Sequence, residues 1–404
     1  MLKKMRRVSE NMAFNVDVIC VFPVFNCSAF LDEAIASVWA QDYDRGRVVL
    51  SAYDDGSSDD SYALLQKHAA LVPPGGRFAM VLGRNERRQP LHQGVAFARN
   101  SAVEQGRAAL VDAQHVVLAF FDADDVMQPT RLSRQVAALT RDWCVAPQSD
   151  VICGSCFERI PAGSTPRYTA WHNSLRADQL TAQMFRETTV AQPTWAMSLQ
   201  LFDNVGAYDA REQCEDLDFL YRHVARGGRL LRIDESLTLY RLNESGASRS
   251  IGWLTLLSVR MRSFEKLVLE RHVSGTFAIW GAGRDGRRFF RALSDHWQRR
   301  VAAFCDIDPE KLALGCFHPP PPYRCEIRAR INSDAGKAPA YANKGEFVAL
   351  FGAATHPSIP IVRVDHELIK PPCVMCVALD RTDGDFERSI PTHWVEGTDF
   401  WHFA

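Results

Sequence analysis

The chain has 404 residues, of which 47% are hydrophobic, and its formal net charge at pH 7 is −1. The length predicts two or three domains, and the hydrophobic fraction excludes a chain that is disordered throughout. The near-zero net charge excludes a protein that coats nucleic acid by overall charge, although local basic patches are compatible with it.

Three features predict a soluble, cytoplasmic protein without a membrane partner. Residues 1–14 are charged and then polar, and they lack the apolar core of a secretory signal. No stretch approaches the roughly 18 consecutive apolar residues of a membrane-spanning helix. The 11 cysteines are scattered, which indicates reduced thiols and not a disulfide framework. No pattern indicates an oligomeric state.

Strand and helix patterns alternate through the first half of the chain, as in an α/β domain with parallel strands. Residues 16–25, VDVICVFPVF, form a near-continuous apolar run that predicts a strand covered on both faces. Residues 28–41 then show the apolar spacing of a helix. Residues 47–69 predict a second strand, a DG turn and a second helix, and residues 115–139 predict a further strand and helix.

The second half begins with a long helical pattern at residues 253–270, which we interpret as a connector between two domains. Strands are then predicted at residues 276–283, 300–308, 346–354 and 371–379, with a helix at residues 284–297. We therefore expect a tail at residues 1–14, a first domain at 15–249, a helical connector at 250–272, and a smaller Rossmann-like α/β domain at 273–404.

Polar clusters follow the predicted strands of the first domain, where parallel α/β sheets bind ligands. They comprise residues 23–26, 54–56 and 122–125, and a fourth cluster at residues 215–216 begins a predicted helix. Each cluster alone is also typical of a turn or a helix cap. However, Asp122, Asp124 and Asp125 would repel one another unless a positive group lies among them. The four clusters together therefore favour a ligand site.

Five motifs of this half resemble those of inverting glycosyltransferases of family 2, which have the GT-A fold, a Rossmann-like α/β architecture. They are PVFNCSAFLDEAIASVWAQ, DDGSSDDS, GVAFARN, FFDADD and CEDLDFLYR, and the resemblance extends over about residues 16–249. It implies metal-dependent transfer from a UDP-sugar to a hydroxyl acceptor. The QxxRW motif of processive polymerases in the family is missing, which favours transfer of a single sugar.

The resemblance also implies roles for individual residues. Asp55 would contact the uracil, Asp124 would hold a metal on the diphosphate, and Asp216 would be the catalytic base. Asp122 would serve the ribose or the metal, and Asn243 stands where the family often has a histidine near the metal. The donor-binding residues implied are Pro23, Val24, Phe25, Asn26, Asp54, Asp55, Gly94, Arg99, Asp122, Ala123 and Asp124, and the acceptor-binding residues are Trp195 and Glu215. Trp195 is equally compatible with a core aromatic, and Asp216 with a capping or salt-bridged acid.

These residue types suit that chemistry. A leaving diphosphate carries negative charge, so it needs a cation such as Mn²⁺ or Mg²⁺, with oxygen ligands, more than it needs a proton donor. A single carboxylate is then sufficient to take the proton from the acceptor hydroxyl. In-line attack inverts the anomeric carbon without a covalent intermediate.

A glycine-rich sequence begins the second domain. Gly281, Gly283 and Gly286 form a GxGxxG pattern directly after a predicted strand and at the start of a predicted helix, and Asp306 ends the next strand. This is the context of a dinucleotide fingerprint. The same glycines could serve only close packing of strand and helix, so a bound nucleotide and tight packing are the two alternatives.

Further motifs, among them FAIWGAGRDGRRFFRAL, VAAFCDIDPEKL and EGTDFWHFA, resemble the β-1,3-N-acetylglucosaminyltransferase-like family, which is identified with queuosine-tRNA galactosyltransferase. This resemblance implies transfer of galactose from UDP-galactose to queuosine in a tRNA anticodon, with tRNA as a partner. The alternatives are a UDP-N-acetylglucosamine transferase that acts on a glycan, and a non-catalytic nucleotide-binding module. Intact carboxylates in the motifs count against the module.

Overall fold

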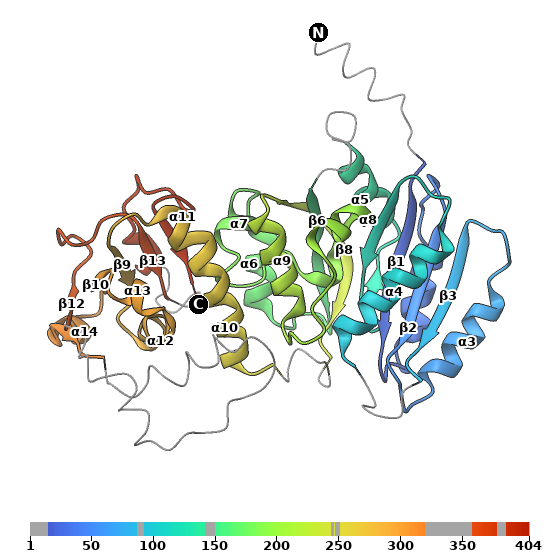
Figure 1. Ribbon diagram of the computed structural model, residues 1–404, viewed down its shortest axis with the longest axis horizontal. Coiled ribbons are helices and arrows are strands. Elements are labelled where there is room, and N and C mark those ends of the chain that lie inside the picture. Colours follow the sequence, from blue (N-terminus) through green and yellow to red (C-terminus); the bar gives the residue numbers. More distant parts are fainter. Residues whose placement is uncertain are drawn as a thin grey trace, which may run out of the picture. The chain divides into compact units, whose positions relative to one another are not determined.

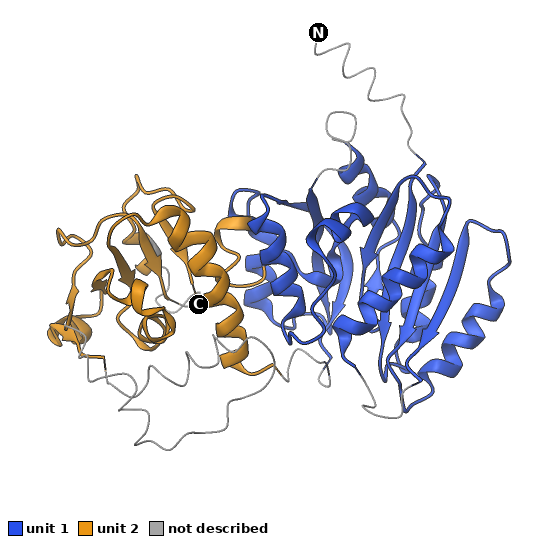
Figure 2. Cartoon of the chain, in the orientation of Figure 1, with its two compact units in different colours: residues 1–180, 189–250 blue, residues 181–188, 251–404 orange. Residues whose placement is uncertain are grey.

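The computed structural model describes residues 15–86, 93–141, 150–243, 246, 251–319, 358–377 and 385–403. Two compact units divide the chain (Figure 2): unit 1 comprises residues 1–180 and 189–250, and unit 2 comprises residues 181–188 and 251–404. The predicted tail at residues 1–14 and the predicted strand at residues 346–354 lie outside the described residues. Among the described helices, none combines the length and the apolar character that crossing a membrane requires.

Parallel strands form one half of the unit 1 sheet (Figure 1), as predicted. β1 (Asp17–Val24) lies between β2 (Val48–Asp54) and β4 (Val116–Phe120), and β3 (Phe78–Arg84) lies beside β2. The helices between these strands are α2 (Leu31–Trp39), α3 (Ser61–Leu71) and α4 (Val95–Ala109). Every residue of β1 is buried, because its alternate side chains enter two different cores, one with α2 and one with α4.

An antiparallel extension completes a sheet of eight strands in the order β3-β2-β1-β4-β7-β6-β8-β5. β7 (Ala196–Ser198) is antiparallel to both β4 and β6 (Val151–Ile160), and β8 (Arg229–Arg241) is parallel to β6. β5 (Val126–Met127) is antiparallel to the end of β8. Because β5 directly follows residues 122–125, this pairing brings the chain beyond β8 to that polar cluster.

Short helices connect the strands of the extension. They are α5 (Arg131–Thr140), α6 (Pro166–Ser174), α7 (Gln179–Ala182), η1 (Gln192–Thr194), α8 (Leu199–Val205) and α9 (Glu215–Ala225). The first turn of α9 contains Glu215, Asp216 and Asp218. Carboxylates are favourable there because the amino-terminal end of a helix carries partial positive charge.

Unit 2 contains a six-stranded sheet in the order β11-β12-β10-β9-β13-β14. Its strands are β9 (Phe277–Trp280), β10 (Val301–Cys305), β11 (Cys316–Phe317), β12 (Ile359–Val362), β13 (Cys373–Met375) and β14 (Phe400–His402). All pairs are parallel except β11 with β12. Its helices after β9 are α12 (Arg284–Ala292), α13 (Asp295–Gln298), α14 (Pro309–Ala313) and α17 (Asp385–Arg388).

The helix that the sequence predicted as a connector belongs to unit 2. α10 (Trp253–Phe264) continues through a π-helical turn, Glu265–Leu269, into α11 (Glu270–His272). The ring of Phe264 is fully buried and lies 5.1 Å from Phe185, 5.5 Å from Phe289 and 5.2 Å from Phe403. This aromatic packing makes the helix, together with residues 181–188, a part of the core of the unit.

Candidate active site

Among the described residues, three hydrogen bonds orient the side chain of Asp55, which lies directly after β2. It is 3% exposed, and its Oδ1 accepts from the Nδ2 of Asn85 at 3.0 Å. Its Oδ2 accepts from the backbone N–H groups of Gln93 and Gly94, at 2.8 and 2.7 Å. Gly94 has a φ of +94°, in the left-handed region that favours glycine. The DDG turn and the GVAFARN motif are therefore joined at this carboxylate.

The end of β1 lies against the same turn. Pro23 and Val24 are the last residues of β1 and are buried, whereas the side chain of Phe25 is 42% exposed. Asn26 has a φ of +51°, and its Oδ1 accepts from the backbone N–H of Ser58 at 2.8 Å. Asp54 is fully buried and accepts from the N–H of Ser57. Asp54 therefore shapes the turn and is not exposed to a ligand.

Arg99, on α4, joins the cluster after β4 to the start of α9. Its Nη2 donates to Asp122 Oδ1 at 2.8 Å, and its Nη1 donates to Glu215 Oε1 at 2.6 Å. Burial opposes the charge of Arg99, but the two carboxylates outweigh it and raise the pKa of its guanidinium. Burial raises the pKa of Glu215 to about 7, against the effect of Arg99. This pairing is strong because little water surrounds it.

Residues 122–125 are also bonded to the end of β8. Asp124 Oδ2 accepts from the Nδ2 of Asn243 at 2.9 Å, and the carbonyl of Asp124 accepts from the Nε of Arg241 at 2.7 Å. Asp125 Oδ1 accepts from the backbone N–H of Arg241, also at 2.7 Å. Burial, followed by the charge of Asp122, raises the pKa of both Asp124 and Asp125. Ala123, between Asp122 and Asp124, is buried.

This donor set fits a divalent cation. Asp122 and Asp124 each use one oxygen for a side-chain hydrogen bond, and a cation at their other oxygens would relieve the repulsion that raises the pKa of Asp124. The second oxygen of Asp125 is buried without a hydrogen-bond partner in the described part of the chain. No group of three or more His, Cys, Asp or Glu side chains that could hold a metal occurs among the described residues. Two carboxylates are nevertheless sufficient for Mg²⁺ when substrate phosphates complete its shell.

Asp216 is partly buried at the start of α9, and its Oδ1 accepts from the N–H of Leu217 at 2.8 Å. Burial raises its pKa, Arg99 opposes this effect and Asp122 adds to it. Asp216 therefore lies within electrostatic range of the other site residues. Among the described residues no ion pair to Asp216 is formed, and the nearby Arg222 instead pairs with Asp218 at 2.8 Å. The salt bridge to Arg222 that the alternative for Asp216 involved is therefore not formed.

The two residues predicted for the acceptor are both buried. Trp195 is 1% exposed, its Nε1 donates to the carbonyl of Val190 at 2.9 Å, and its ring lies beside Phe219. Trp195 is therefore placed as the core-aromatic alternative predicted, and almost none of its surface is accessible to an acceptor. Glu215 is 7% exposed, and its carboxylate forms an ion pair with Arg99.

The glycine loop of unit 2 is tightly packed. A Cβ added to Gly286 would lie 1.8 Å from the carbonyl oxygen of Gly281, which itself has a φ of +108°. Asp306 Oδ2 accepts from the backbone N–H of Ala282 at 2.7 Å, so this carboxylate binds the loop itself. Only glycine fits such a close approach. Gly281 and Gly286 are thus placed as the packing alternative requires, whereas a Cβ on Gly283 would lie 3.7 Å from its nearest neighbour, Lys311, and would be tolerated.

Sequence reasoning missed one residue of the site, Asn85, and it missed the contacts of Arg241, which the resemblance implied as a contact of the diphosphate. Asn85 holds Asp55, and the signal for it was its position directly after β3, at the same edge of the sheet. Arg241 holds Asp124 and Asp125 and pairs with Glu33 at 2.7 Å. No local signal places Arg241, because its partners come from segments far away in the sequence.

Comparisons with known proteins address the same region. Residues 19–206 match the family model described as Glycosyl transferase family 2. A protein from Haemophilus influenzae, described as an uncharacterized glycosyltransferase, is 24% identical over 186 residues. That match covers 46% of this chain and 65% of the relative, which is less than two thirds of its length.

Two solved structures show partial similarity. For S. aureus TarS 1–349 in complex with UDP-GlcNAc, the TM-score is 0.45 at 15% identity, over 71% of this chain and 72% of that one. For the mannosyltransferase PcManGT from Pyrobaculum calidifontis, in complex with GDP-Man and Mn²⁺, the TM-score is 0.44 at 19% identity. The match covers 63% of this chain and 64% of that one.

The family match extends from β1 to the end of α8 and includes the DDG, GVAFARN and DADD motifs. The mixed α/β sheet of unit 1, with its antiparallel extension, confirms the predicted fold class. Over residues 19–206 the chain is therefore similar to glycosyltransferases of family 2, and its mixed α/β fold is consistent with the GT-A fold.

Proposed function

We propose that this chain transfers one sugar from a UDP-sugar to a hydroxyl acceptor, with inversion at the anomeric carbon. The observation that carries the proposal is the Arg99 bridge, which gathers Asp122 from the end of β4 and Glu215 from the start of α9. The residues assigned to the donor and the residue assigned as base thereby share one edge of the sheet. Parallel α/β sheets bind their ligands at such an edge.

In this proposal Asp216 removes the proton of the acceptor hydroxyl while that oxygen attacks the anomeric carbon. The bond from the anomeric carbon to the diphosphate oxygen breaks, and UDP leaves with the electron pair. Burial raises the pKa of Asp216 and so makes it a stronger base than an exposed aspartate. Arg99 opposes this rise in pKa, because its positive charge favours the ionised carboxylate.

The remaining roles concern the donor. Asp55, whose oxygens are oriented by Asn85 and by the start of α4, holds the uracil. A divalent cation, Mn²⁺ or Mg²⁺, held by Asp122, Asp124 and Asn243 would supply positive charge for the leaving diphosphate.

Asp124→Ala is expected to abolish metal-dependent donor binding. The affinity for UDP in the presence of Mn²⁺, measured by calorimetry, should fall by more than the roughly 10–100-fold that is typical for loss of an outer-shell partner of a metal. Asp112→Ala is the control, because Asp112 precedes β4 at the opposite edge of the sheet and pairs there with Arg47. Unchanged UDP affinity of Asp124→Ala would remove Asp124 from the metal site.

The donor and acceptor in this proposal are UDP-galactose and queuosine in the tRNA anticodon. The sequence resemblance of the second half supports this assignment. On unit 2, the guanidinium of Arg288 lies 4.7 Å from the ring of Trp253, whose side chain is 50% exposed. Arg284, on the same helix, has a side chain that is 61% exposed. Exposed cations and rings of this kind suit contacts with RNA phosphates and unstacked bases.

A transfer assay with UDP-galactose and Mn²⁺ tests the assignment. Total tRNA from queuosine-replete and queuosine-free cells is the acceptor, and the product nucleosides are identified by mass. We expect a hexose to be added only to the replete sample. Transfer to a glycan acceptor from UDP-N-acetylglucosamine, without transfer to either tRNA sample, would replace the tRNA assignment with the glycan alternative.

A further inference from the structure

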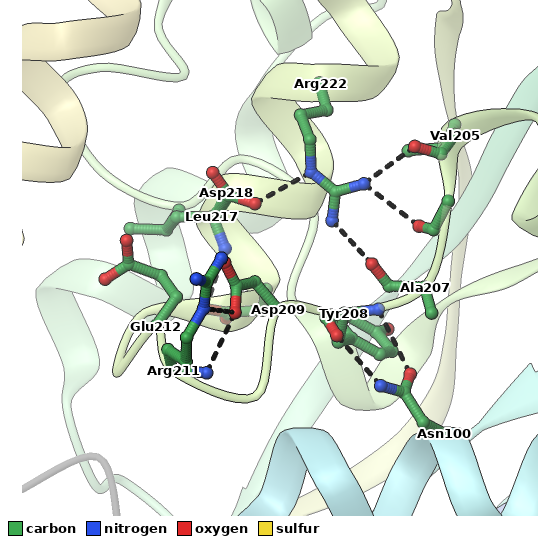
Figure 3. A network of polar contacts seen from close by, with 12 residues as sticks. Asn100, Val205, Ala207, Tyr208, Asp209, Arg211, Glu212, Leu217, Asp218 and Arg222 are labelled. Atoms are coloured by element: carbon green, nitrogen blue, oxygen red, sulfur yellow. Dashed lines mark hydrogen bonds and ion pairs between the residues drawn. The ribbon is translucent and has the colours of Figure 1, made fainter. Parts of the chain in front are cut away.

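We propose that Asn100 and Arg222 are positioning residues, which hold the loop between α8 and α9 (residues 206–214) so that its exposed tip forms part of the acceptor subsite beside Asp216. This inference rests on the proposed transferase function, and it assigns a role to side chains outside the donor and base residues. A network of polar contacts that joins α4, α9 and this loop supports it (Figure 3).

Asn100 bonds to both backbone groups of one loop residue. Its Nδ2 donates to the carbonyl of Tyr208 at 2.8 Å, and its Oδ1 accepts from the N–H of Tyr208 at 3.1 Å (Figure 3). A side-chain amide offers a donor and an acceptor together, and so it can satisfy a peptide unit on both sides. Asn100 directly follows Arg99 on α4, so adjacent residues of one helix bind the charged cluster and the loop.

The ring of Tyr208 connects this anchor to the reacting groups. It is 3% exposed and lies 5.9 Å from the ring of Phe120, the last residue of β4, and 4.9 Å from the ring of Phe219 on α9. The guanidinium carbon of Arg99 lies 6.0 Å from the same ring. Through Phe219, Tyr208 therefore packs the loop against α9, the helix that carries Asp216.

Arg222 fixes the first residues of the loop from α9 itself. Its Nη1 donates to the carbonyls of Val205 and Gly206 at 2.7 and 3.0 Å, and its Nη2 donates to that of Ala207 at 3.0 Å (Figure 3). Its Nε is oriented by Asp218 at 2.8 Å. Arginine commonly binds the last carbonyls of a helix in this way, here those at the end of α8. The helix that carries Asp216 in its first turn is thus bonded to the loop that precedes it.

The tip of the loop is polar and exposed. The N–H and Nε of Arg211 donate to Asp209 Oδ1 at 2.9 and 3.0 Å, and the side chain of Arg211 is 73% exposed. The chain then runs directly into Glu215 and Asp216. An acceptor hydroxyl must come within hydrogen-bond distance of the base. The polar side chains immediately before Asp216 are therefore placed to contact the acceptor molecule.

Asn100→Ala tests the inference against Asn173→Ala. Asn173 is a matched control, because it makes the same pair of bonds to the backbone of Phe157, at 2.9 and 3.3 Å. Three quantities are measured: hydrogen exchange of the amides of residues 206–214, the affinity for UDP with Mn²⁺, and kcat/KM for queuosine-containing tRNA with UDP-galactose. For Asn100→Ala we expect at least tenfold faster exchange in the loop, unchanged UDP affinity, and a fall in kcat/KM of about 10–100-fold, because small misplacements of catalytic geometry have effects of this order.

Asn173→Ala should leave all three quantities at the wild-type level. Arg222→Lys should act in the same direction as Asn100→Ala but less strongly, since the three N–H donors on one ammonium nitrogen cannot replace the four bonds that the guanidinium forms to three carbonyls and Asp218. This variant is used if Asn100→Ala does not fold. Wild-type exchange and kcat/KM in both loop variants would overturn the inference, as would a parallel loss of UDP affinity. Absence of transfer by the wild-type enzyme would instead contradict the proposed function, while hydrogen exchange would still decide whether Asn100 holds the loop.

Discussion

Asp216→Asn is expected to lower the rate of sugar transfer by about 10²–10⁴-fold, the range that general base catalysis typically contributes. Asparagine has nearly the same shape as aspartate but no basic oxygen. UDP affinity should not change, because the contacts proposed for the uracil and the diphosphate are made by Asp55, Asp122 and Asp124. Steady-state kinetics and calorimetric titration with UDP measure the two quantities.

The pH dependence of the same reaction provides a second test of Asp216. The base must be ionised to accept a proton, so the rate should fall as the pH drops through its pKa. Since burial raises that pKa, the loss should begin at a higher pH than for an exposed aspartate. The residual activity of Asp216→Asn should lack this acidic decline.

Asp203→Asn is a suitable control for Asp216→Asn, because Asp203 is a half-exposed acid near the end of α8 that pairs with Arg107. It should retain the transfer rate and the pH profile of the wild type. Retained turnover in Asp216→Asn would assign the base to another residue. Loss of UDP affinity in that variant would show a contribution to donor binding.

Arg99→Met is expected to lower the free energy of unfolding by about 3–5 kcal/mol, the usual effect of removing one partner of a buried ion pair. Glu215 would lose its bond at 2.6 Å and stay buried, and Asp122, whose side chain is 28% exposed, would lose one at 2.8 Å. Unfolding in urea measures the change. The positive charge also lowers the pKa of Glu215 and Asp216, so its loss should move the acidic decline of activity to higher pH.

Arg107→Met is the control for Arg99→Met: it also removes one positive charge and one ion pair, but at an exposed position, so the comparison shows how much of the destabilisation is due to burial. Arg107 lies on the same helix and pairs with Asp203, but the two side chains are 37% and 46% exposed. An exposed ion pair of this kind contributes about 0–1 kcal/mol. Equal destabilisation in both variants would mean that the Arg99 bridge has no special role in the fold.

The parallel half of unit 1 could be predicted from the sequence because its strands are long apolar runs, each followed by a helix. The same topology predicted that Asp55 and Asp122, each directly after a parallel strand, lie at one edge of the sheet. The antiparallel extension could not be predicted in the same way. β5 has two residues and β7 has three, too few for a periodic pattern, and their partners are set by contacts across the sheet.

Two further features depend on packing that the local sequence does not reveal. The helix at Trp253–Phe264 has the pattern of a connector, yet Phe264 is buried among aromatic rings of its own unit. Trp195 stands beside a motif that suggests the acceptor, yet it fills the core. Arg99 was predicted from its motif as a donor residue, whereas its two ion pairs could be recognised only once α4, β4 and α9 had been placed together.

The pairing of β5 with β8 has a consequence for the order in which the enzyme matures during synthesis. Asp125 and Arg241 are 116 positions apart, and Asp124 and Asn243 are 119 apart. A nascent chain can therefore assemble β1–β4 and hold Asp55 long before the proposed cation site is complete, since closing so long a loop must await the distant segment. A ribosome-bound or truncated chain that ends before β8 would contain the DADD motif without Asn243 or Arg241. The ability to hold a cation on a nucleotide would then be acquired last, when β8 docks.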